Sequence, residues 1–344
     1  MTDIELFNYN LPDSLIAQRP AEKRDASRMM VLNRKTKTIT HNMFTSFTNY
    51  LRAGDTLVIN DTKVFPARLH GTRKTGGAIE ILLCRRISDG VWETMVRGLK
   101  KLSTGETIRI ANAEIALIEK LEGGLAIFDF GSDEAVQDIA QAYGETPLPP
   151  YISRPGGKID KTDKERYQTV FAKEEGSCAA PTAGLHFTDE VLKEIRAKGV
   201  EVVTVTLHVG PATFKPVKTK KIEDHLMGQE PFLISESTAE IINRAKSEKR
   251  RVIAVGSTVT RALETSAQET GKVTAGAGVS SLYITPGFTF NVVDVLLTNF
   301  HLPKSTLLMM VTAFAGYEFI IKAYNEAVAS KYRFFSYGDV MLLV

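Results

Sequence analysis

Cysteine is scarce in this sequence, which has two of them, Cys84 and Cys178, far apart along the chain. A disulfide framework, a structural zinc site and an iron–sulfur cluster each need more thiolates, so the composition argues against all three. Other potential ligands also lack the spacing of a metal site. We therefore expect no metal and no permanently bound cofactor, and a reducing cytoplasm suits the chain.

Long hydrophobic runs and a strong excess of one charge are missing as well. The longest apolar stretch, 307–317, is shorter than the roughly 20 residues that span a bilayer. The acidic N-terminus has no apolar segment typical of a secretory signal. We expect a cytoplasmic location without membrane association. The net charge of +3 does not by itself indicate a nucleic-acid partner, so local clusters must decide that question.

Motifs of the common nucleotide-binding and hydrolytic enzymes are absent. The sequence has no GxxxxGK[ST] phosphate loop, no HExxH, no GxSxG and no zinc-deaminase signature. The glycine-dense run 276–278 follows a helical pattern and a polar linker, whereas a dinucleotide-binding loop follows a strand. We interpret this run as a mobile loop.

Short strand-like runs separated by glycine-containing turns extend from about 65 to 131, a pattern typical of a small antiparallel barrel. The expected strands are Ile79–Arg85, Val91–Arg97, Thr107–Ile110, Glu114–Lys120 and Ala126–Phe130. A helix capped by Ser132 and a proline-rich connector follow. We predict that 65–150 is a β-barrel domain inserted into a layered α/β domain formed by 1–64 and 151–344.

Strands and helices alternate in the two flanking segments, which indicates the α/β class. Besides a hairpin of Arg28–Leu32 with Thr38–His41, the expected strands are Thr56–Ile59, Glu201–Val209, Val252–Val255, Leu282–Ile284 and Val292–Leu297. The expected helices are Asp160–Phe171, Asp189–Ala197, Thr238–Glu248, Val259–Glu269 and Thr306–Ser330. We expect Thr188 and Ser237 to cap two of these helices and Gly271 to end a third.

A loop rich in small and polar residues, 176–188, precedes one predicted helix. It contains Thr182, Gly184, His186 and Thr188, and the N–H groups of the following helix N-terminus favour an anion or carboxylate. A structural turn before a capped helix would explain any one of these residues. Their combination favours a binding site.

Polar residues also follow three predicted strands, where ligands of α/β sheets bind. His208 ends one strand, Thr258 and Arg261 follow another, and a third is followed by Thr298, Asn299 and His301. A helix N-terminus near Thr258 suits a carboxylate or ribose. A core histidine and an ordinary turn remain alternatives for the first two, whereas packing alone hardly explains the third group.

Four lysines, Lys215, Lys218, Lys220 and Lys221, lie between His208 and the pair Asp224-His225. Such a run is usually a solvated face. Because it lies near the candidate site, it is also a candidate strip for nucleic-acid phosphates. Contact through Arg97, Lys100 and Lys101 of the predicted barrel is the alternative.

Several long motifs resemble the S-adenosylmethionine:tRNA ribosyltransferase-isomerase family of queuosine biosynthesis. The matching stretches are 27–28, 58–69, 179–188, 206–210, 224–225, 297–303 and 332–339, and they extend over essentially the whole chain. One departure is Gly228, since the family usually has a second histidine there. The family's Gly-Thr-Thr-Ser-Val-Arg turn is represented by 256–261, which keeps hydroxyls and the arginine.

The resemblance implies a specific reaction. The ribosyl group of S-adenosylmethionine is transferred to the aminomethyl group of 7-aminomethyl-7-deazaguanine at the wobble position of tRNA, giving epoxyqueuosine-tRNA, adenine and methionine. The implied order is deprotonation next to the sulfonium, loss of adenine, attack by the amine, and epoxide closure with loss of methionine. The two substrates are then the partners, and we expect the chain to act as a monomer.

This chemistry needs a base and a neutral amine. The candidates for proton transfer are His186, His208, His225 and His301, because histidine titrates near neutral pH. Asp61 and Asp224 are candidates for orienting them or for holding the amine. Arg261 and the helix N-terminus near Thr258 suit the methionine carboxylate. The sequence does not decide which histidine acts first.

Two other functions remain open at this point. An S-adenosylmethionine-dependent tRNA methyltransferase would leave S-adenosylhomocysteine, and the missing glycine-rich fingerprint argues against it. A non-catalytic tRNA-binding protein would explain the barrel and the lysines. The histidines and hydroxyls at predicted strand ends argue against that alternative.

Overall fold

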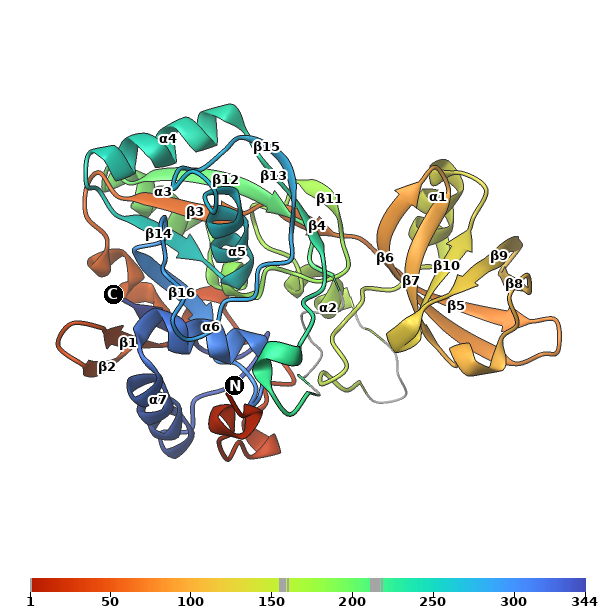
Figure 1. Cartoon of the computed structure of the whole chain (residues 1–344), viewed down its shortest axis with the longest axis horizontal. Coiled ribbons are helices and arrows are strands. Elements are labelled where there is room, and N and C mark those ends of the chain that lie inside the picture. Colours follow the sequence, from red (N-terminus) through yellow and green to blue (C-terminus); the bar gives the residue numbers. More distant parts are fainter. Residues whose placement is uncertain (1, 155–158, 160, 211–216, 218) are drawn as a thin grey trace.

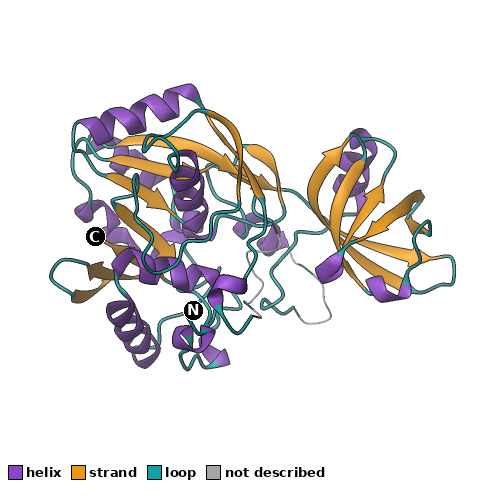
Figure 2. Cartoon of the chain, in the orientation of Figure 1, coloured by secondary structure: helices purple, strands orange, loops and turns teal. Residues whose placement is uncertain are grey.

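The computed structural model describes residues 2–154, 159, 161–210, 217 and 219–344. It has a nine-stranded sheet with helices on both faces and a closed six-stranded antiparallel barrel beside it (Figure 1). Figure 2 shows that helices gather around the large sheet, whereas strands form most of the barrel. The predicted fold class, a layered α/β fold with an antiparallel β-barrel, is confirmed.

The large sheet has the order β15-β13-β12-β3-β14-β16-β17-β1-β2. Its strands are β1 (Arg28–Asn33), β2 (Thr38–Met43), β3 (Thr56–Asn60), β12 (Glu201–Leu207), β13 (Glu230–Ile234), β14 (Val252–Val255), β15 (Gly276–Ser280), β16 (Val295–Asn299) and β17 (Val340–Leu343). The adjacent strands β12, β3, β14 and β16 run parallel, so their carboxyl ends share one edge of the sheet.

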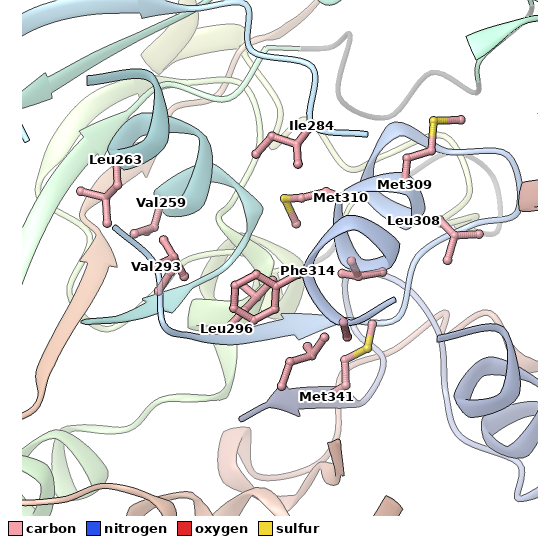
Figure 3. Packing of buried hydrophobic residues seen from close by; sticks show 14 of the residues in the cluster. Val259, Leu263, Ile284, Val293, Leu296, Leu308, Met309, Met310, Phe314 and Met341 are labelled. Atoms are coloured by element: carbon pink, nitrogen blue, oxygen red, sulfur yellow. The ribbon is translucent and has the colours of Figure 1, made fainter. Parts of the chain in front are cut away.

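Helices cover the two faces of this sheet because successive strand residues point to opposite sides. Val58 packs with α4 (Glu236–Ser247), α5 (Ser257–Ser266), α6 (Thr306–Ala315) and α7 (Tyr317–Ala329) in one core, part of which Figure 3 shows. Leu57 and Ile59 belong to the opposite core, with α3 (Asp189–Ala197) and the 3-10 helix Phe44–Tyr50. The core strands β3, β14 and β16 are buried throughout, as expected for parallel strands between helical layers.

The barrel strands are β5 (Arg68–Arg73), β6 (Ala78–Ser88), β7 (Val91–Arg97), β8 (Thr107–Ile110), β9 (Ala113–Lys120) and β10 (Leu125–Asp129). The five predicted strands are present, and Ser132 caps α1 (Asp133–Tyr143) as expected. The sequence did not indicate β5, because its residues are mostly polar and include Gly71. The domain boundaries at 65 and 150 stay a prediction.

One predicted helix is shorter than expected. The helix α2 (Lys161–Arg166) ends well before Phe171. Beyond it, the Gln168 side chain bonds both backbone groups of Val64, at 3.1 Å each. These bonds hold the chain in a non-helical path toward β11 (Glu174–Ser177), which pairs with β4 (Thr62–Val64).

The predicted helix Thr306–Ser330 is two helices. Gly316 has a φ of 95°, a conformation that glycine adopts without strain, and α6 and α7 meet there at a bend of 118°. Apolar periodicity continues through the bend, so the pattern did not indicate it. Among the described residues, no single helix has the length and apolar character needed to cross a membrane.

The prediction of a mobile loop at 276–278 was wrong, since this run forms β15 and pairs with β13. Gly278 has no Cβ, and a Cβ there would lie 2.5 Å from the ring of Phe232. The predicted strand Leu282–Ile284 is irregular. The strand predicted from Val292 begins at Val295, because the preceding N–H groups donate to the buried Glu264 carboxylate.

Two predicted helix boundaries also differ. Ser235, two residues before the predicted Ser237, caps α4 by accepting from the backbone of Thr238. The helix α5 ends at Ser266, and Gly271 instead closes a later turn by donating to Ala267 O at 2.8 Å.

Candidate active site

The carboxyl edge of the large sheet brings distant parts of the chain together. Asn60 ends β3, Gly256 follows β14, and Asn299 ends β16. The strand β17 runs antiparallel to β16 with Val340 opposite Asn299, so the segment before Val340 reaches the same edge. Parallel pairing of β17 with β1 also brings Ser27 there.

A pocket with a cavity volume of about 60 Å³ lies at this edge. Its lining combines hydroxyl, amide and imidazole groups with aromatic rings. The lining residues include Tyr151, Thr182, Gly256, Ser257, Thr258, Thr298, Asn299, His301, Ser305, Phe335 and Ser336. Four predicted binding residues, Thr182, Thr258, Thr298 and Asn299, therefore share one pocket with one predicted catalytic residue, His301.

Hydrogen bonds connect the pocket to buried side chains. Thr182 Oγ1 donates to Asn299 Oδ1 at 2.9 Å, and Asn299 Nδ2 lies 3.2 Å from His186 Nε2. The other ring nitrogen, His186 Nδ1, lies 2.8 Å from Ser27 Oγ. Ser27, His186 and Asn299 are all buried. Because both ends of the Asn299 amide have partners, this network gives the amide one orientation.

His186 has a definite protonation state in this network. Asn299 Nδ2 also reaches the carbonyl of Phe335 at 3.2 Å, so this nitrogen is a donor and His186 Nε2 accepts. The proton of His186 is therefore assigned to Nδ1, which donates to Ser27. Burial, assisted by the charge of Arg333, lowers the pKa of His186 to about 3. A neutral His186 is suited to orienting Asn299.

His301 is placed directly in the pocket. Its Nε2 lies 3.1 Å from Thr298 Oγ1, and burial lowers its pKa to about 3. The imidazole is therefore neutral at pH 7. Together with the Thr298 hydroxyl, it can hydrogen-bond a polar group of a ligand.

The N-terminus of α5 also meets the pocket. Its N-cap, Gly256, supplies no side-chain hydrogen bond, so the first-turn N–H groups near Ser257 and Thr258 are suited to a carboxylate. Arg261, predicted to hold the same carboxylate, is buried in an ion pair with Glu230. Its charge is already balanced, which favours a structural role for Arg261.

His208 lies at a second cavity, between the large sheet and the barrel. Its Nδ1 lies 2.8 Å from Thr62 Oγ1, and its ring packs directly against Gly176. A Cβ at Gly176 would lie 2.9 Å from the imidazole, and this residue has a φ of 148°. The glycine therefore allows the close approach of the two segments.

The surroundings of His208 differ from those of the other two histidines. Burial lowers the pKa of His208, but the carboxylates of Asp61 and Glu174 oppose this effect. Asp61 is itself buried and accepts a hydrogen bond from Thr206 Oγ1 at 2.6 Å. His208 is neutral at pH 7 and keeps more of its basicity than a histidine surrounded by apolar groups.

Two residues of the predicted loop site serve the fold. Thr188 caps α3 by accepting from the backbone of Val191 at 3.2 Å. Gly184 allows close packing, since a Cβ there would lie 2.8 Å from the ring of Phe171. Neither is among the described residues that line the pocket at the sheet edge.

The pair Asp224-His225 lies in another part of the α/β region. Asp224 is exposed at the end of the 3-10 helix Ile222–Asp224. His225 meets the ring of Tyr283 edge-on, with centroids 5.4 Å apart, and burial lowers its pKa. Neither side chain is among the described residues of the two cavities.

The lysine strip is only partly described. Lys215 and Lys218 lie outside the described residues. Lys220 is exposed, and Lys221 Nζ lies 3.6 Å from a carboxylate oxygen of Asp3. The structure thus leaves Lys220 accessible to a phosphate and places Lys221 beside a carboxylate.

Sequence reasoning missed the aromatic side of the pocket. The segment 332–339 is one of the stretches that carry the family resemblance, but no site residue was predicted in it, and β17 begins after it. Phe335 has a φ of 74°, which is unusual for a bulky residue, and its ring centroid lies 4.2 Å from that of Tyr151. Tyr151 Oη is 2.5 Å from Ser336 Oγ. The aromatic cluster in 332–337 was the available signal.

The structure also bears on metal and thiol chemistry. Within the described part of the chain, no group of three or more His, Cys, Asp and Glu could hold a metal ion. Both cysteines are buried thiols, and neither takes part in a disulfide. Burial raises the pKa of Cys178 to about 12, and its thiol donates to Val209 O at 3.0 Å. Cys178 is thus protonated at neutral pH.

Comparisons with known proteins agree with this architecture. Residues 4–343 match the family described as "Queuosine biosynthesis protein". The chain is 49% identical over 341 residues to the S-adenosylmethionine:tRNA ribosyltransferase-isomerase of Caldanaerobacter subterraneus, with 98% of each chain covered. It is 50% identical over 339 residues to that of Sulfurihydrogenibium, with the same coverage. It also resembles the crystal structure of S-adenosylmethionine tRNA ribosyltransferase from Thermotoga maritima, with a TM-score of 0.57, 36% identity and coverage of 98% and 100% of the two chains.

Proposed function

The chain belongs to the queuosine biosynthesis protein family, and we propose that it is an S-adenosylmethionine:tRNA ribosyltransferase-isomerase. It transfers the ribosyl group of S-adenosylmethionine to the aminomethyl group of 7-aminomethyl-7-deazaguanine at the wobble position of tRNA. Epoxyqueuosine-tRNA, adenine and methionine are the products. The structural observation that most supports this function is the convergence of Thr182, Asn299 and His301 on one pocket at the sheet edge.

Part of S-adenosylmethionine binds at this pocket in our proposal. A cavity of about 60 Å³ equals roughly four to six water positions at about 10–15 Å³ each, which suits the methionyl end or the ribose but not the whole donor. The N-terminus of α5 at Ser257 and Thr258 faces the carboxylate. Asn299, Thr298 and His301 supply donors and acceptors for hydroxyl groups.

The histidines divide into different roles. A general base works best when its pKa lies near the operating pH. With pKa values near 3, His186 and His301 are weak bases. His208 has the charges of Asp61 and Glu174 beside it, and we assign proton transfer to His208. His186 is a positioning residue, and His301 is a neutral hydrogen-bonding group.

The remaining assignments follow from the reaction. S-adenosylmethionine is a co-substrate, and no metal or permanently bound cofactor takes part in the proposed steps. tRNA is the second substrate, with Lys220 and Lys221 as candidate contacts to its phosphates. We propose that the enzyme acts in the cytoplasm and as a monomer.

Product analysis tests this function. The protein is incubated with S-adenosylmethionine and tRNA carrying the aminomethyl base, and small molecules are separated by chromatography. We expect adenine and methionine in equal amounts, with a matching mass increase of the tRNA. S-adenosylhomocysteine would instead show a methyltransferase, and binding of tRNA without any product would show a non-catalytic protein.

A further inference from the structure

The cavity between the barrel and the large sheet is distinct in position and size from the pocket at the sheet edge. Its volume is about 370 Å³, against about 60 Å³ for the pocket. At about 10–15 Å³ for each water position, this volume equals roughly 25 to 37 water positions, which is enough for a nucleotide. Most of its lining comes from the barrel and α1, and the large-sheet region contributes Glu175, Gly176, His208 and Pro231.

The barrel side of this cavity has the groups that recognise a nucleobase. Trp92 lines the cavity, is partly exposed, and packs against Phe65 with ring centroids 5.8 Å apart. An aromatic ring of this kind is a stacking surface for a base. Gln137 and Gln141 are exposed, line the same cavity and lie four residues apart on α1, hence on one face of the helix. Their amides can donate to and accept from a base edge.

The opposite side has the groups that the acceptor amine requires. The aminomethyl group is a cation until it loses a proton, and it must be neutral to attack a carbon atom. Glu175 and His208 both line the cavity, Glu175 precedes Gly176 in the chain, and the His208 ring packs against Gly176. The Glu175 carboxylate is half-exposed and lies 3.8 Å from Lys63 Nζ. A carboxylate attracts the ammonium group, and the neutral imidazole can accept its proton, leaving an amine and an imidazolium.

The position of the cavity relates it to the pocket at the sheet edge. His208 lines the cavity, and the next residue, Val209, lines the pocket. The segment leading from Gly176 to Ala180 likewise passes from one to the other. The cavity and the pocket are therefore lined by nearby residues of the same two segments. A nucleotide in the cavity and S-adenosylmethionine in the pocket would bind close to each other.

We propose that the cavity between barrel and sheet receives the acceptor nucleotide of tRNA, with its base stacked on Trp92 and its edge contacted by Gln137 and Gln141. The inference rests on the proposed function, because it takes tRNA as the acceptor. It gives the barrel a defined role, which is to supply one wall of the acceptor site. The donor remains at the sheet edge.

Trp92 is the only tryptophan of the chain, so intrinsic fluorescence reports on this cavity without any mutation. The probe is an anticodon stem-loop RNA with 7-aminomethyl-7-deazaguanine at the wobble position. We expect its titration to change Trp92 emission with the same midpoint as binding measured by anisotropy of labelled RNA. S-adenosylmethionine alone should leave the emission unchanged. RNA binding without an emission change, or an emission change with S-adenosylmethionine alone, would overturn the proposal.

Substitutions in the cavity provide a second measurement. Trp92→Leu should weaken RNA binding by about 5- to 150-fold, the range of one base–aromatic stack. Gln137→Ala with Gln141→Ala should weaken it by roughly 3- to 10-fold. S-adenosylmethionine binding should stay within about twofold, since these side chains touch only the acceptor. Tyr143→Ala, an exposed position at the end of the same helix, is the matched control and should leave both affinities unchanged.

The two proposals fail in different ways. If the wild-type protein binds the RNA with a change in Trp92 emission but releases no adenine, the proposed function is wrong and the nucleotide site remains. If adenine is released at a normal rate while the glutamine variants retain full RNA affinity and Trp92 emission never responds, the nucleotide site is wrong and the function remains.

Discussion

The barrel and the carboxyl edge of the large sheet bury different kinds of side chain. Within residues 65–150, all of which the structure describes, the buried polar side chains are Thr94 and Thr146. At the sheet edge, by contrast, His186, Asn299 and His301 are buried together with several hydroxyl groups. Burying a polar group is unfavourable unless it is hydrogen-bonded.

At the sheet edge the buried polar groups are joined in a hydrogen-bond network, whereas the barrel buries few polar side chains and so needs few such bonds. A fully hydrogen-bonded network holds a few side chains in one geometry, as chemistry requires. An apolar barrel holds its outer surface in place and needs no such network. The difference indicates that the sheet edge performs chemistry and that the barrel contributes through its surface. The following experiments test this division, beginning with the largest expected effect.

Replacing His208 should have the largest effect. We expect His208→Gln to lower kcat by about 100- to 10,000-fold, the contribution of a general base. In the wild type, activity should fall at acid pH with an apparent pKa below 6.5, because burial lowers the pKa of His208. This acid limb should disappear in the variant. His186→Ala should lower kcat but keep the limb, and loss of the limb in that variant would reverse the two roles.

Asn299→Ala removes the amide that joins Thr182 to His186. Misplacement of reacting groups by about 1 Å can lower a rate about 100-fold, and we expect a loss of kcat of at least this size in a folded protein. Adenine release and thermal unfolding are measured together. Asn243→Ala is the control and should retain turnover, because it removes two hydrogen bonds with the backbone of Val273 and Asn243 lines neither cavity among the described residues. Near-normal turnover of Asn299→Ala would remove Asn299 from the site.

The next largest effect should be on the free energy of unfolding at acid pH, which depends on the buried histidines of the sheet edge. In the folded protein the pKa of His301 is about 3, against 6.5 without the fold, so the unfolded state binds more protons between these values. The free energy of unfolding should therefore fall as the pH drops from 6.5 toward 3, by up to about 1.4 kcal/mol per pH unit from this histidine.

Urea unfolding at pH 7 and pH 5.5 measures this change. His301→Gln should lose less stability on acidification than the wild type. The same substitution at His70, which is exposed on the barrel, should leave the pH dependence unchanged. If His301→Gln and the wild type lose the same amount, the buried site is not the origin of the effect.

Salt dependence compares the two regions as surfaces for tRNA. Lys220→Gln with Lys221→Gln should weaken binding and reduce the slope of log affinity against log salt by roughly one to two units, about 0.9 per duplex phosphate contact. S-adenosylmethionine binding should barely change. Lys100→Gln with Lys101→Gln, exposed on the barrel, is the matched pair. A reduced slope for that pair alone would place the phosphates on the barrel.

We expect a chelator to leave the turnover rate unchanged. The proposed steps use imidazole, hydroxyl and amide groups, so turnover in EDTA should equal turnover without it. The rate of adenine release is measured after extended dialysis against the chelator. Loss of activity that one specific metal restores would contradict this prediction.

Local sequence patterns predicted much of the fold. The barrel strand Val91–Arg97 and the helix Asp189–Ala197 have the predicted bounds, because turn residues and helix caps are local signals. The predictions were wrong where contacts between distant residues determine whether a strand forms or where it begins. β15 forms through its pairing with β13, and the late start of β16 depends on the Glu264 carboxylate.

The candidate site shows the same limit. The polar loop before a predicted helix indicated Thr182, and polar residues after predicted strands indicated Thr258, Asn299 and His301. All four line one pocket. Arg261 has the same kind of position in the sequence, but the structure pairs it with Glu230 on another strand. Nothing in the local pattern distinguishes an arginine that binds a ligand from one that is already neutralised.

The sequence by itself determined the alternation of strands and helices, five of the six barrel strands, and which polar residues stand near the strand ends. Only the tertiary structure decided that Asn299 meets His186 and Thr182, while His208 faces the barrel across Gly176. The physical reason is that strand order and register depend on how whole apolar faces pack. The two contacts of Asn299 join residues more than a hundred positions apart, which no local pattern can indicate.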